Sequence, residues 1–419
     1  MRADRTTLLV VLALGMLAVA PALGASGRGD AGEPSGEPSG APGRAGLERD
    51  LQAILEAFLA DDPVAPGVSA RAVCPLVGLS WSGAAGRVRR DGDEPLTPAH
   101  TFRIASNTKP YTAAAVLRLV EQGRLGLDDP LARHLPREQR SLLAADGYDL
   151  DAMTLRQVLG HTSGLCDHSD GDAYAAAIIA DPQHVWTADE QIRFCIEQCD
   201  PVGAPGETYR YSDTGYVILG EIVSRATGRL LGPAVRDLLG LDALGLPDTW
   251  WEDQEPRPAT ANPRAHQYYG DHDVTDWNPS IDLHGGGGLV SSAADLARFL
   301  RLLLEGHVFE RPETLETMVQ SGTPTYRLGL AAVELAGHSA LGHQGFWNTF
   351  AFHVADLDLT VAGSIFSHEA ANGRLLAEAL VARVAAAAGS PPSTARRPEP
   401  TPGRPSSATP RSCSPPDRP

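Results

Sequence analysis

The sequence is almost without lysine: of its 35 lysine and arginine residues, Lys109 is the only lysine. Positive charge is scarce as well, because 52 acidic residues leave a formal net charge of −17 over 419 residues. Proteins that bind nucleic acids need a basic face, so this charge balance argues against a nucleic acid as a partner.

Long apolar runs are missing from the interior of the chain. No stretch there approaches the ~20 apolar residues of a membrane-spanning helix, which excludes a polytopic membrane protein. Residues 1–25 differ: Arg2 and Arg5 precede a short apolar run, Leu8–Val19, and small residues follow it. This order is typical of a cleaved secretory signal peptide. A lipoprotein would need a cysteine at the cleavage point, and no cysteine lies near it. We expect a secreted or periplasmic protein with no stable membrane span after cleavage; an uncleaved anchor is the alternative.

Two compositionally biased segments flank the part of the chain that can fold. Residues 26–46 repeat Gly-Glu-Pro-Ser and contain almost no large apolar side chain, which predicts a flexible linker. Residues 389–419 are rich in proline, serine and arginine and are predicted to be a disordered tail. The remaining residues, 47–388, suffice for one large domain.

Within residues 47–388, the apolar patterns indicate strands near both ends and helices between them. The patterns are an amphipathic helix around Leu51–Leu59, strands at Val68–Val73 and Val77–Trp81, a helix capped by Ser292 and ended by Gly306, a hairpin of Thr349–Val354 and Leu359–Ile365, and a last helix from about Asn372 to Ala388. We predict an α/β (α+β) fold in which one sheet with flanking helices is built from both ends, about 47–105 and 307–388. Residues from about 106 to 306 are predicted to be an inserted, mainly helical region.

Cysteine is infrequent too, with five residues, one of them (Cys413) in the predicted tail. Export permits disulfides, and the cysteines at 74, 166, 195 and 199 allow three pairings among which the sequence does not choose. No histidine or cysteine lies at the spacing of a zinc finger, so we expect neither a metal site nor an organic cofactor.

Lys109 is unusual because the rest of the chain uses arginine. Arginine keeps its proton under practically all conditions, whereas a lysine amine can lose its proton when it is desolvated. A site that needs a neutral amine, or a compact ammonium that relays a proton, cannot use arginine instead. The alternative is that Lys109 is a surface lysine that survived by chance.

Ser106 precedes Lys109 by three residues, at the predicted start of a helix. Pro110 places both residues in the first turn of that helix, so that their side chains share a face. A serine at a helix N-terminus beside an amine is an activated nucleophile, and the helix dipole favours an oxyanion there. Ser-x-x-Lys is also a catalytic signature, although these residues alone make a weak one.

The motifs that follow resemble those of the serine β-lactamases and penicillin-binding D,D-peptidases, in particular the class C β-lactamase-like branch. Tyr211-Ser212-Asp213 is similar to the Tyr-x-Asn element of that family, with one change, and His343-Gln344-Gly345 looks like its third motif, Lys-Thr-Gly or His-x-Gly. Leu155–Leu165 and Gly286–Ala297 resemble further landmarks. The resemblance covers nearly all of residues 47–388 and implies an antiparallel sheet in a β-lactamase/transpeptidase-like fold.

The resemblance also implies a role for each matching residue. Ser106 is expected to be the acylated nucleophile, and Lys109 and Tyr211 are expected to share the work of general base and acid. A phenol near cationic groups can have a lowered pKa, which would suit Tyr211 for this work. A buried structural tyrosine is the alternative for Tyr211.

The third motif is expected to lie on the edge strand that lines the cleft. Gly345 would let a substrate backbone approach closely, and Gln344 lies beside it. His343 replaces a fixed positive charge by a titratable one, which weakens binding of a substrate carboxylate at neutral pH. The oxyanion hole implied by the resemblance consists of the backbone N–H groups of Ser106 and Phe346.

Asp213 is the main departure from the family pattern, since relatives have asparagine there. An amide can donate a hydrogen bond to a substrate carbonyl, whereas a carboxylate only accepts. If Asp213 faces the cleft, it holds Lys109 protonated, repels acidic substrates and favours substrates with a free amine. The alternative is that Asp213 points away and caps the helix that begins near Thr214.

Two further patterns have structural interpretations. The segment 284–287, His-Gly-Gly-Gly, matches the oxyanion segment of lipases, but no Gly-x-Ser-x-Gly accompanies it, so a tight turn is expected. His161 is expected to be structural, at a helix end, rather than a catalytic base.

The sequence thus predicts an exported serine hydrolase that forms an acyl-enzyme on Ser106 with an amide or ester. Its substrate would be a small molecule or peptide: a peptidoglycan-type peptide ending in D-Ala-D-Ala, a β-lactam or an ester. A carboxypeptidase, a D-amino peptide hydrolase or an esterase is favoured over a true class C-like β-lactamase because of Asp213. A catalytically weak penicillin-binding or sensor protein with the same fold is the other alternative. The oligomeric state is left open.

Overall fold

A computed structural model of the chain describes residues 43–62, 64–370 and 372–389. The predicted signal peptide and nearly all of the predicted linker and tail lie outside these residues. Contacts divide the chain into residues 1–40 and 41–419, and all of the described residues belong to the second unit. Among the described helices, none is both long enough and apolar enough to cross a membrane.

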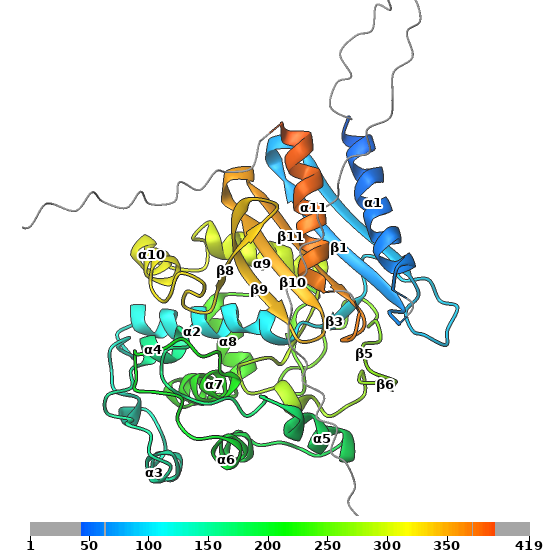
Figure 1. The fold of residues 1–419 in the computed structure, drawn as a ribbon. Coiled ribbons are helices and arrows are strands. Elements are labelled where there is room, and N and C mark those ends of the chain that lie inside the picture. Colours follow the sequence, from blue (N-terminus) through cyan, green and yellow to red (C-terminus); the bar gives the residue numbers. More distant parts are fainter. Residues whose placement is uncertain (1–42, 63, 371, 390–419) are drawn as a thin grey trace, which may run out of the picture. The chain divides into compact units, whose positions relative to one another are not determined.

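Helices and strands follow one another in a mixed order (Figure 1). The helices are α1 (Arg44–Ala60), α2 (Lys109–Glu121), α3 (Arg137–Ala145), α4 (Leu155–Leu159), α5 (Asp172–Ala180), α6 (Ala188–Gln198), α7 (Asp213–Thr227), α8 (Leu231–Leu239), α9 (Ala293–Leu304), α10 (Pro312–Gln320) and α11 (Gly373–Ala388). The strands are β1 (Gly67–Cys74), β2 (Leu79–Gly86), β3 (Thr101–Arg103), β4 (Trp250–Trp251), β5 (Tyr268–Tyr269), β6 (His272–Asp273), β7 (Leu289–Ser292), β8 (Ala331–Leu335), β9 (His338–Gly345), β10 (Thr349–Val354) and β11 (Leu359–Ile365). Short 3₁₀ turns are η1 (Pro75–Val77), η2 (Ala105–Thr108), η3 (Leu131–Arg133), η4 (Pro279–Asp282) and η5 (Ala355–Leu357).

The main sheet has six strands in the order β2-β1-β11-β10-β9-β8, and every neighbouring pair is antiparallel. β1 pairs with β11, so strands from the two ends of the domain lie side by side inside the sheet. The prediction of a sheet built from both ends is therefore confirmed. The predicted hairpin is present as β10 and β11 with the predicted bounds.

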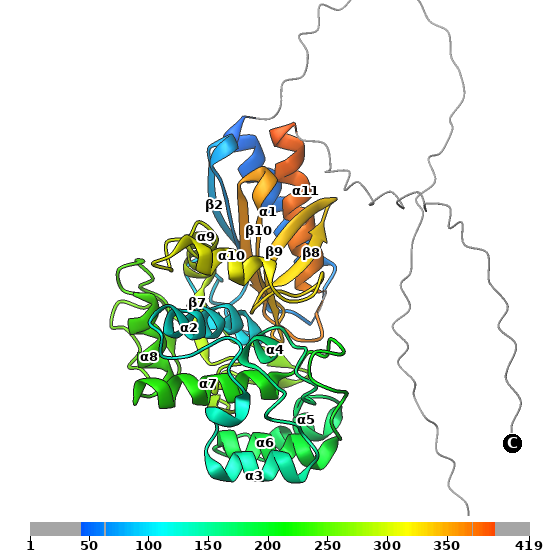
Figure 2. The same cartoon turned by 90° about the vertical axis from the view of Figure 1, so that its left-hand side faces the viewer.

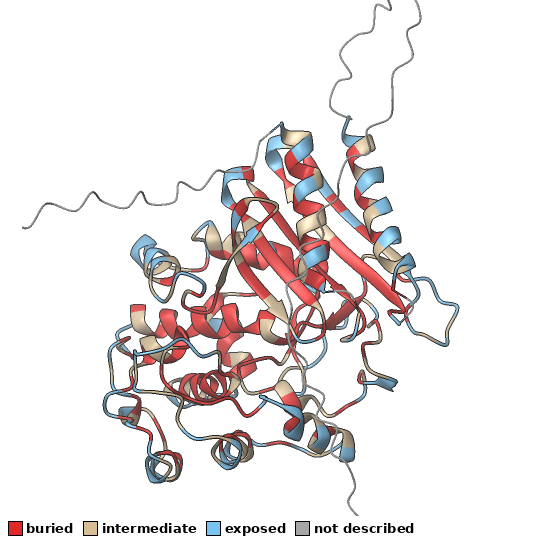
Figure 3. Cartoon of the chain, viewed as in Figure 1, coloured by how far each residue is buried: buried red, intermediate tan, exposed pale blue. Residues whose placement is uncertain are grey.

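Helices cover both faces of this sheet. α1 and α11 lie next to each other on one face, and α9 packs on the other (Figure 1). Successive side chains of a strand point to opposite faces. In β10, Phe350 and Phe352 accordingly pack with the core under α1 and α11, whereas Ala351 belongs to the core on the α9 side. Figure 3 shows the strands mostly buried and the outer helices exposed on one side.

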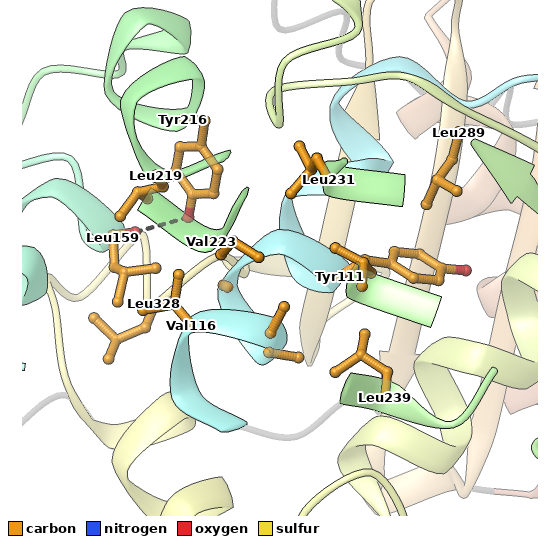
Figure 4. Close-up of a cluster of buried hydrophobic side chains, with 14 of the residues drawn as sticks. Tyr111, Val116, Leu159, Tyr216, Leu219, Val223, Leu231, Leu239, Leu289 and Leu328 are labelled. Carbon is orange, nitrogen blue, oxygen red and sulfur yellow. Dashed lines mark hydrogen bonds between the residues drawn. The ribbon is translucent and has the colours of Figure 1, made fainter. Parts of the chain in front are cut away.

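The inserted helical region is organised around α2 and α7, which pack against each other (Figure 2). Figure 4 shows the apolar side chains gathered there, including Tyr111 and Val116 of α2 and Leu219 of α7. The hydroxyl of Tyr216, also on α7, donates a 2.9 Å hydrogen bond to the carbonyl of Leu159, so this buried phenol is satisfied. A helix that is apolar on all sides belongs in a core, and α2 is buried along nearly its whole length.

The structure differs from the sequence-based expectations in its details. α1 begins at Arg44, inside the predicted linker. A second sheet, β3-β7-β4, lies partly within the region predicted to be helical, because two- to four-residue strands carry too little periodicity to be recognised. The structure contains one disulfide, Cys166–Cys199, and Cys74 and Cys195 are buried free thiols, so none of the three full pairings is formed.

Candidate active site

Ser106 lies in the 3₁₀ turn η2, which leads directly into α2 at Lys109. Ser106 therefore precedes the α-helix, and the prediction that Pro110 places it in the first α-helical turn is wrong by about one turn. Ala105, just before it, has a φ of +45°, a left-handed conformation that a residue with a side chain adopts only when its surroundings hold it there. This turn brings Ser106 to the wall of a cavity.

Lys109 is completely buried, and its ammonium group donates to three acceptors. These are Ser106 Oγ at 2.9 Å, the carbonyl of Gly286 at 3.0 Å, and Asp213 Oδ1. An ammonium has three protons, so every one of them is used. The glycine run was predicted to form only a turn; the contribution of the Gly286 carbonyl was missed, because a backbone acceptor leaves no signature in a sequence.

Asp213 is the first residue of α7 and faces Lys109. The N-cap of this helix is Ser212, whose side chain accepts from the N–H of Gly215 at 3.1 Å, so the alternative in which Asp213 is the cap is wrong. Burial by itself would raise the pKa of Asp213, but the charge and the hydrogen bond of Lys109 outweigh burial and bring this pKa to about 2. Asp213 and Lys109 form an ion pair in which the lysine is buried and the aspartate side chain is 22% exposed.

A second carboxylate, Asp167, is linked to this pair through the hydroxyl of Ser169. Ser169 Oγ lies 3.0 Å from Asp167 Oδ1 and 3.1 Å from Asp213 Oδ2. Burial, and then the charge of Asp213, raise the pKa of Asp167 to about 7. The Ser169 hydroxyl has one proton and can donate to only one of the two carboxylates. Its contact with the other is a hydrogen bond only when that carboxyl is protonated and donates to Ser169 Oγ. The raised pKa assigns that proton to Asp167.

Replacing Asp167 by asparagine is expected to make the stability of the protein less dependent on pH. An unfolded aspartate loses its proton near pH 3.9. The folded protein keeps this proton up to about pH 7, so its stability falls as the pH rises from 4 to 7. Thermal unfolding should show that the stability of the Asp167→Asn variant, relative to that of the wild type, is higher at pH 8 than at pH 5. The exposed Asp151→Asn variant serves as the control, and an equal difference at both pH values would contradict the assignment.

Tyr211 lies beside Lys109, in the loop before α7. Its ring centre lies 5.0 Å from Lys109 Nζ, and its side chain interacts with that of Ser106. Burial, and then the charge of Asp213, raise the pKa of Tyr211 well above its usual value of 10. The prediction of a lowered pKa is therefore wrong, because Asp213 offsets the charge of Lys109 and desolvation dominates.

His161 lies behind Tyr211, and the ring centres are 4.3 Å apart. Its Nδ1 accepts a 3.1 Å hydrogen bond from the N–H of Ser212. Burial, and then the charge of Lys109, lower the pKa of His161 well below its usual value, so this ring is neutral. These contacts agree with the structural interpretation, and they position the backbone that carries Tyr211 and Asp213.

The third motif lies on β9, which is not an edge strand as predicted. β8 pairs with β9 from His338 to Gly342, and only residues 343–345 extend beyond β8. His343 Nδ1 donates to the carbonyl of Gln344 at 2.6 Å, and His343 Nε2 accepts from the hydroxyl of Tyr326 at 3.0 Å. Burial, and then Lys109, lower the pKa of His343 to about 3. His343 is thus a neutral ring with both nitrogens occupied and offers no positive charge.

Gly345 lies where β9 meets η2, the turn that carries Ser106. A Cβ atom at this position would lie 2.5 Å from the carbonyl oxygen of Ile104 and 3.1 Å from the Cβ of Ala105. The glycine therefore admits the segment before Ser106. Approach of a substrate backbone at Gly345 stays a prediction. Ser106 and Phe346, whose backbone N–H groups are the expected oxyanion hole, both line the cavity.

The cavity beside Ser106 has an aromatic wall that the sequence did not reveal. The wall is formed by Tyr174, Tyr269, Trp277, Phe346 and Trp347, with carboxylates at positions 172, 213 and 282. None of the described residues that line this cavity is an arginine or a lysine. These residues come from separate segments, and only long-range folding brings them together.

Comparison with known proteins places the chain in a group of related sequences. The sequence model of the Beta-lactamase family matches residues 68–386. Esterase EstB of Burkholderia gladioli is 37% identical over 179 residues, which are 41% of this chain and 44% of EstB. A putative penicillin-binding protein, PbpX, of Bacillus subtilis is 26% identical over 260 residues, or 60% of this chain and 59% of PbpX. The chain thus matches about half the length of these curated relatives.

Solved structures cover more of the chain. A D-stereospecific amidohydrolase from Streptomyces sp. is 28% identical, with a TM-score of 0.66 over 81% of this chain and 98% of that one. A D-amino acid amidase from Ochrobactrum anthropi SV3, complexed with L-phenylalanine amide, is 25% identical, with a TM-score of 0.67 over 81% and 98% of the two chains. These similarities confirm the predicted fold class.

Proposed function

Because the chain belongs to the β-lactamase family of serine hydrolases, we propose that it forms an acyl-enzyme on Ser106 with a small amide or ester and then hydrolyses it. The observation that carries the proposal is the buried Lys109 ammonium, 2.9 Å from Ser106 Oγ, at the wall of a cavity. Export to the periplasm or the medium, expected from residues 1–25, is part of this proposal.

The reaction follows from the hydrogen bonds around Ser106. Ser106 Oγ attacks the carbonyl carbon, and the N–H groups of Ser106 and Phe346 stabilise the oxyanion. The Ser106 proton passes to Tyr211, whose own hydroxyl proton goes to the leaving nitrogen or oxygen as its bond to the carbonyl carbon breaks. Water then cleaves the ester with the proton transfers reversed, which releases the acid and restores Ser106.

Lys109 serves this reaction as a cation. All of its protons are donated, one of them to Ser106 Oγ, so the ammonium stabilises negative charge that develops on the nucleophile. Tyr211 has a raised pKa and keeps its proton in the resting enzyme, which suits a group that transfers one proton while it receives another.

The charges of the site favour amides and small esters over β-lactams and D-Ala-D-Ala peptides. Both disfavoured classes present a carboxylate. His343 is neutral, Asp213 is negative, and the described residues that line the cavity include no arginine or lysine. The similar proteins include an esterase and an amidohydrolase, which supports the same preference for amides and small esters.

Labelling and a substrate panel test the proposal. We expect a fluorophosphonate probe to label the protein. We expect kcat/KM to be at least ~10-fold higher for a p-nitrophenyl ester or an amino acid anilide than for a cephalosporin or a D-alanyl-D-alanine peptide, because like charges are costly in a closed site. A folded protein without labelling would favour the binding or sensor alternative, and a preference for the cephalosporin would favour a β-lactamase.

A further inference from the structure

One wall of the cavity carries a carboxylate that the mechanism does not use. Asp282, the last residue of η4, lines the same cavity as Ser106. Its carboxylate lies against Gly287, where a Cβ atom would come within 1.9 Å of Oδ2. The Asp282 carboxylate can occupy this space because residue 287 is a glycine and has no side chain.

The cations near Asp282 are committed to other partners. Lys109 donates its three protons elsewhere. The guanidinium of Arg103 binds Glu252 and the carbonyls of Val274 and Trp277. Among the described residues, none donates a hydrogen bond to the Asp282 carboxylate. Burial, and then Asp213, raise the pKa of Asp282 to about 7, although Lys109 and Arg103 act in the opposite direction.

The other carboxylates of the cavity are less suited to receive a ligand cation. Asp213 has its charge balanced by Lys109. Asp172 is exposed at the start of α5, where water competes for any ion pair. Asp282 is the carboxylate that is both partly shielded from water and without a donor.

The aromatic wall faces the same space. Trp277 and Trp347 are buried, with 9% and 5% of their surface exposed, and Tyr174 is held by a 3.0 Å hydrogen bond from its hydroxyl to the carbonyl of Ile281. Aromatic faces attract cations and also pack well against apolar groups. A ligand with an ammonium group next to an apolar side chain fits both features of this cavity.

We propose that Asp282 binds the ammonium group of the substrate while the aromatic wall holds an apolar side chain, so that the enzyme prefers amides or esters of amino acids with a free amine. This inference rests on the proposed function, because the same substrate must reach Ser106. Asp282 is then the residue that determines specificity for the amine, whereas Asp213 maintains the charge of Lys109.

The test compares two substrates that differ only in the amine. They are phenylalanine p-nitroanilide, as each enantiomer, and 3-phenylpropionic acid p-nitroanilide. We expect the wild type to prefer at least one amino substrate, and the ratio of kcat/KM, amino over desamino, to fall at least ~10-fold in the Asp282→Asn variant. The exposed Asp151→Asn variant should keep the wild-type ratio. A ratio that is unchanged in Asp282→Asn, or that falls in Asp172→Asn instead, would overturn the proposal.

A binding experiment separates this inference from the proposed function. In the Ser106→Ala background, calorimetry with phenylalanine amide and 3-phenylpropionamide measures recognition of the amine without any reaction. We expect tighter binding of the amino compound, and loss of that difference when Asp282→Asn is added. Equal binding of the two amides before Asp282 is changed would overturn the role of Asp282. Failure of the wild type to hydrolyse any substrate, with the binding difference intact, would instead overturn only the proposed function.

Discussion

Exchange of Lys109 for arginine is expected to lower the acylation rate of Ser106 at least ~100-fold, the size of a lost acid–base or charge contribution. Arginine keeps the positive charge, but its planar head group is larger and directs its N–H groups differently from a compact ammonium. Lys109 is completely buried among three acceptors that match a compact ammonium. Stopped-flow acylation with a chromogenic ester measures the rate. Near-normal turnover would mean that Lys109 is only a counter-charge to Asp213.

The ion pair provides a control that separates catalysis from folding. Lys109→Met leaves Asp213 without its partner and is expected to cost about 2–3 kcal/mol of stability, because a mostly buried charge, 22% exposed, loses its counter-ion. Adding Asp213→Asn removes that charge and should recover most of the loss. Both variants should remain unable to acylate. Recovery of activity together with stability in the double variant would show that the lysine is needed only for folding.

Replacing Ser106 by alanine is expected to abolish covalent labelling and to lower hydrolysis by ~10⁴-fold or more, as removal of a nucleophile does in other serine hydrolases. The protein should stay folded. The change removes one of three acceptors of Lys109, and a lost hydrogen bond of this kind costs about 1–2 kcal/mol.

Ser169→Ala is the matched control for the nucleophile, since it removes another hydroxyl from the same cavity. Ser169 contacts the Asp213 and Asp167 carboxylates, not Lys109, so the Ser169→Ala variant should still be labelled. Mass spectrometry of the labelled wild type should place the probe on Ser106. A probe found on any other residue, or labelling that survives in Ser106→Ala, would refute the assignment.

Local spacing explains why the core of the site could be predicted. Ser106 and Lys109 are three residues apart, and one short turn fixes their contact. The motif at 211–213 was expected to approach Lys109 because of the resemblance to a family, and the structure brings Asp213 and Tyr211 to it.

The remaining features depend on tertiary structure. Asp282 and Asp167 carry no motif. Contacts between distant segments bring Asp282 to the cavity beside Ser106 and link Asp167 to Asp213 through Ser169. The Gly286 carbonyl contributes a backbone atom that any residue would possess. The motifs also do not predict which groups carry a proton. The pKa of Tyr211 depends on burial and on the balance between the charges of Lys109 and Asp213, and the sequence pattern gives none of these quantities.

The pairing of β1 with β11 has a consequence for how the chain folds. This contact joins segments from opposite ends of the domain, so its high contact order predicts slow formation, with a large loop-closure entropy to overcome. Until β11 arrives, β1 and β2 form a hairpin with an open edge and lack the core that α11 completes. During synthesis the main sheet therefore cannot close before the last strand has left the ribosome. A nascent chain with this order of assembly exposes the edge of β1 until synthesis of the domain is nearly complete, which makes that edge the site most open to wrong pairing.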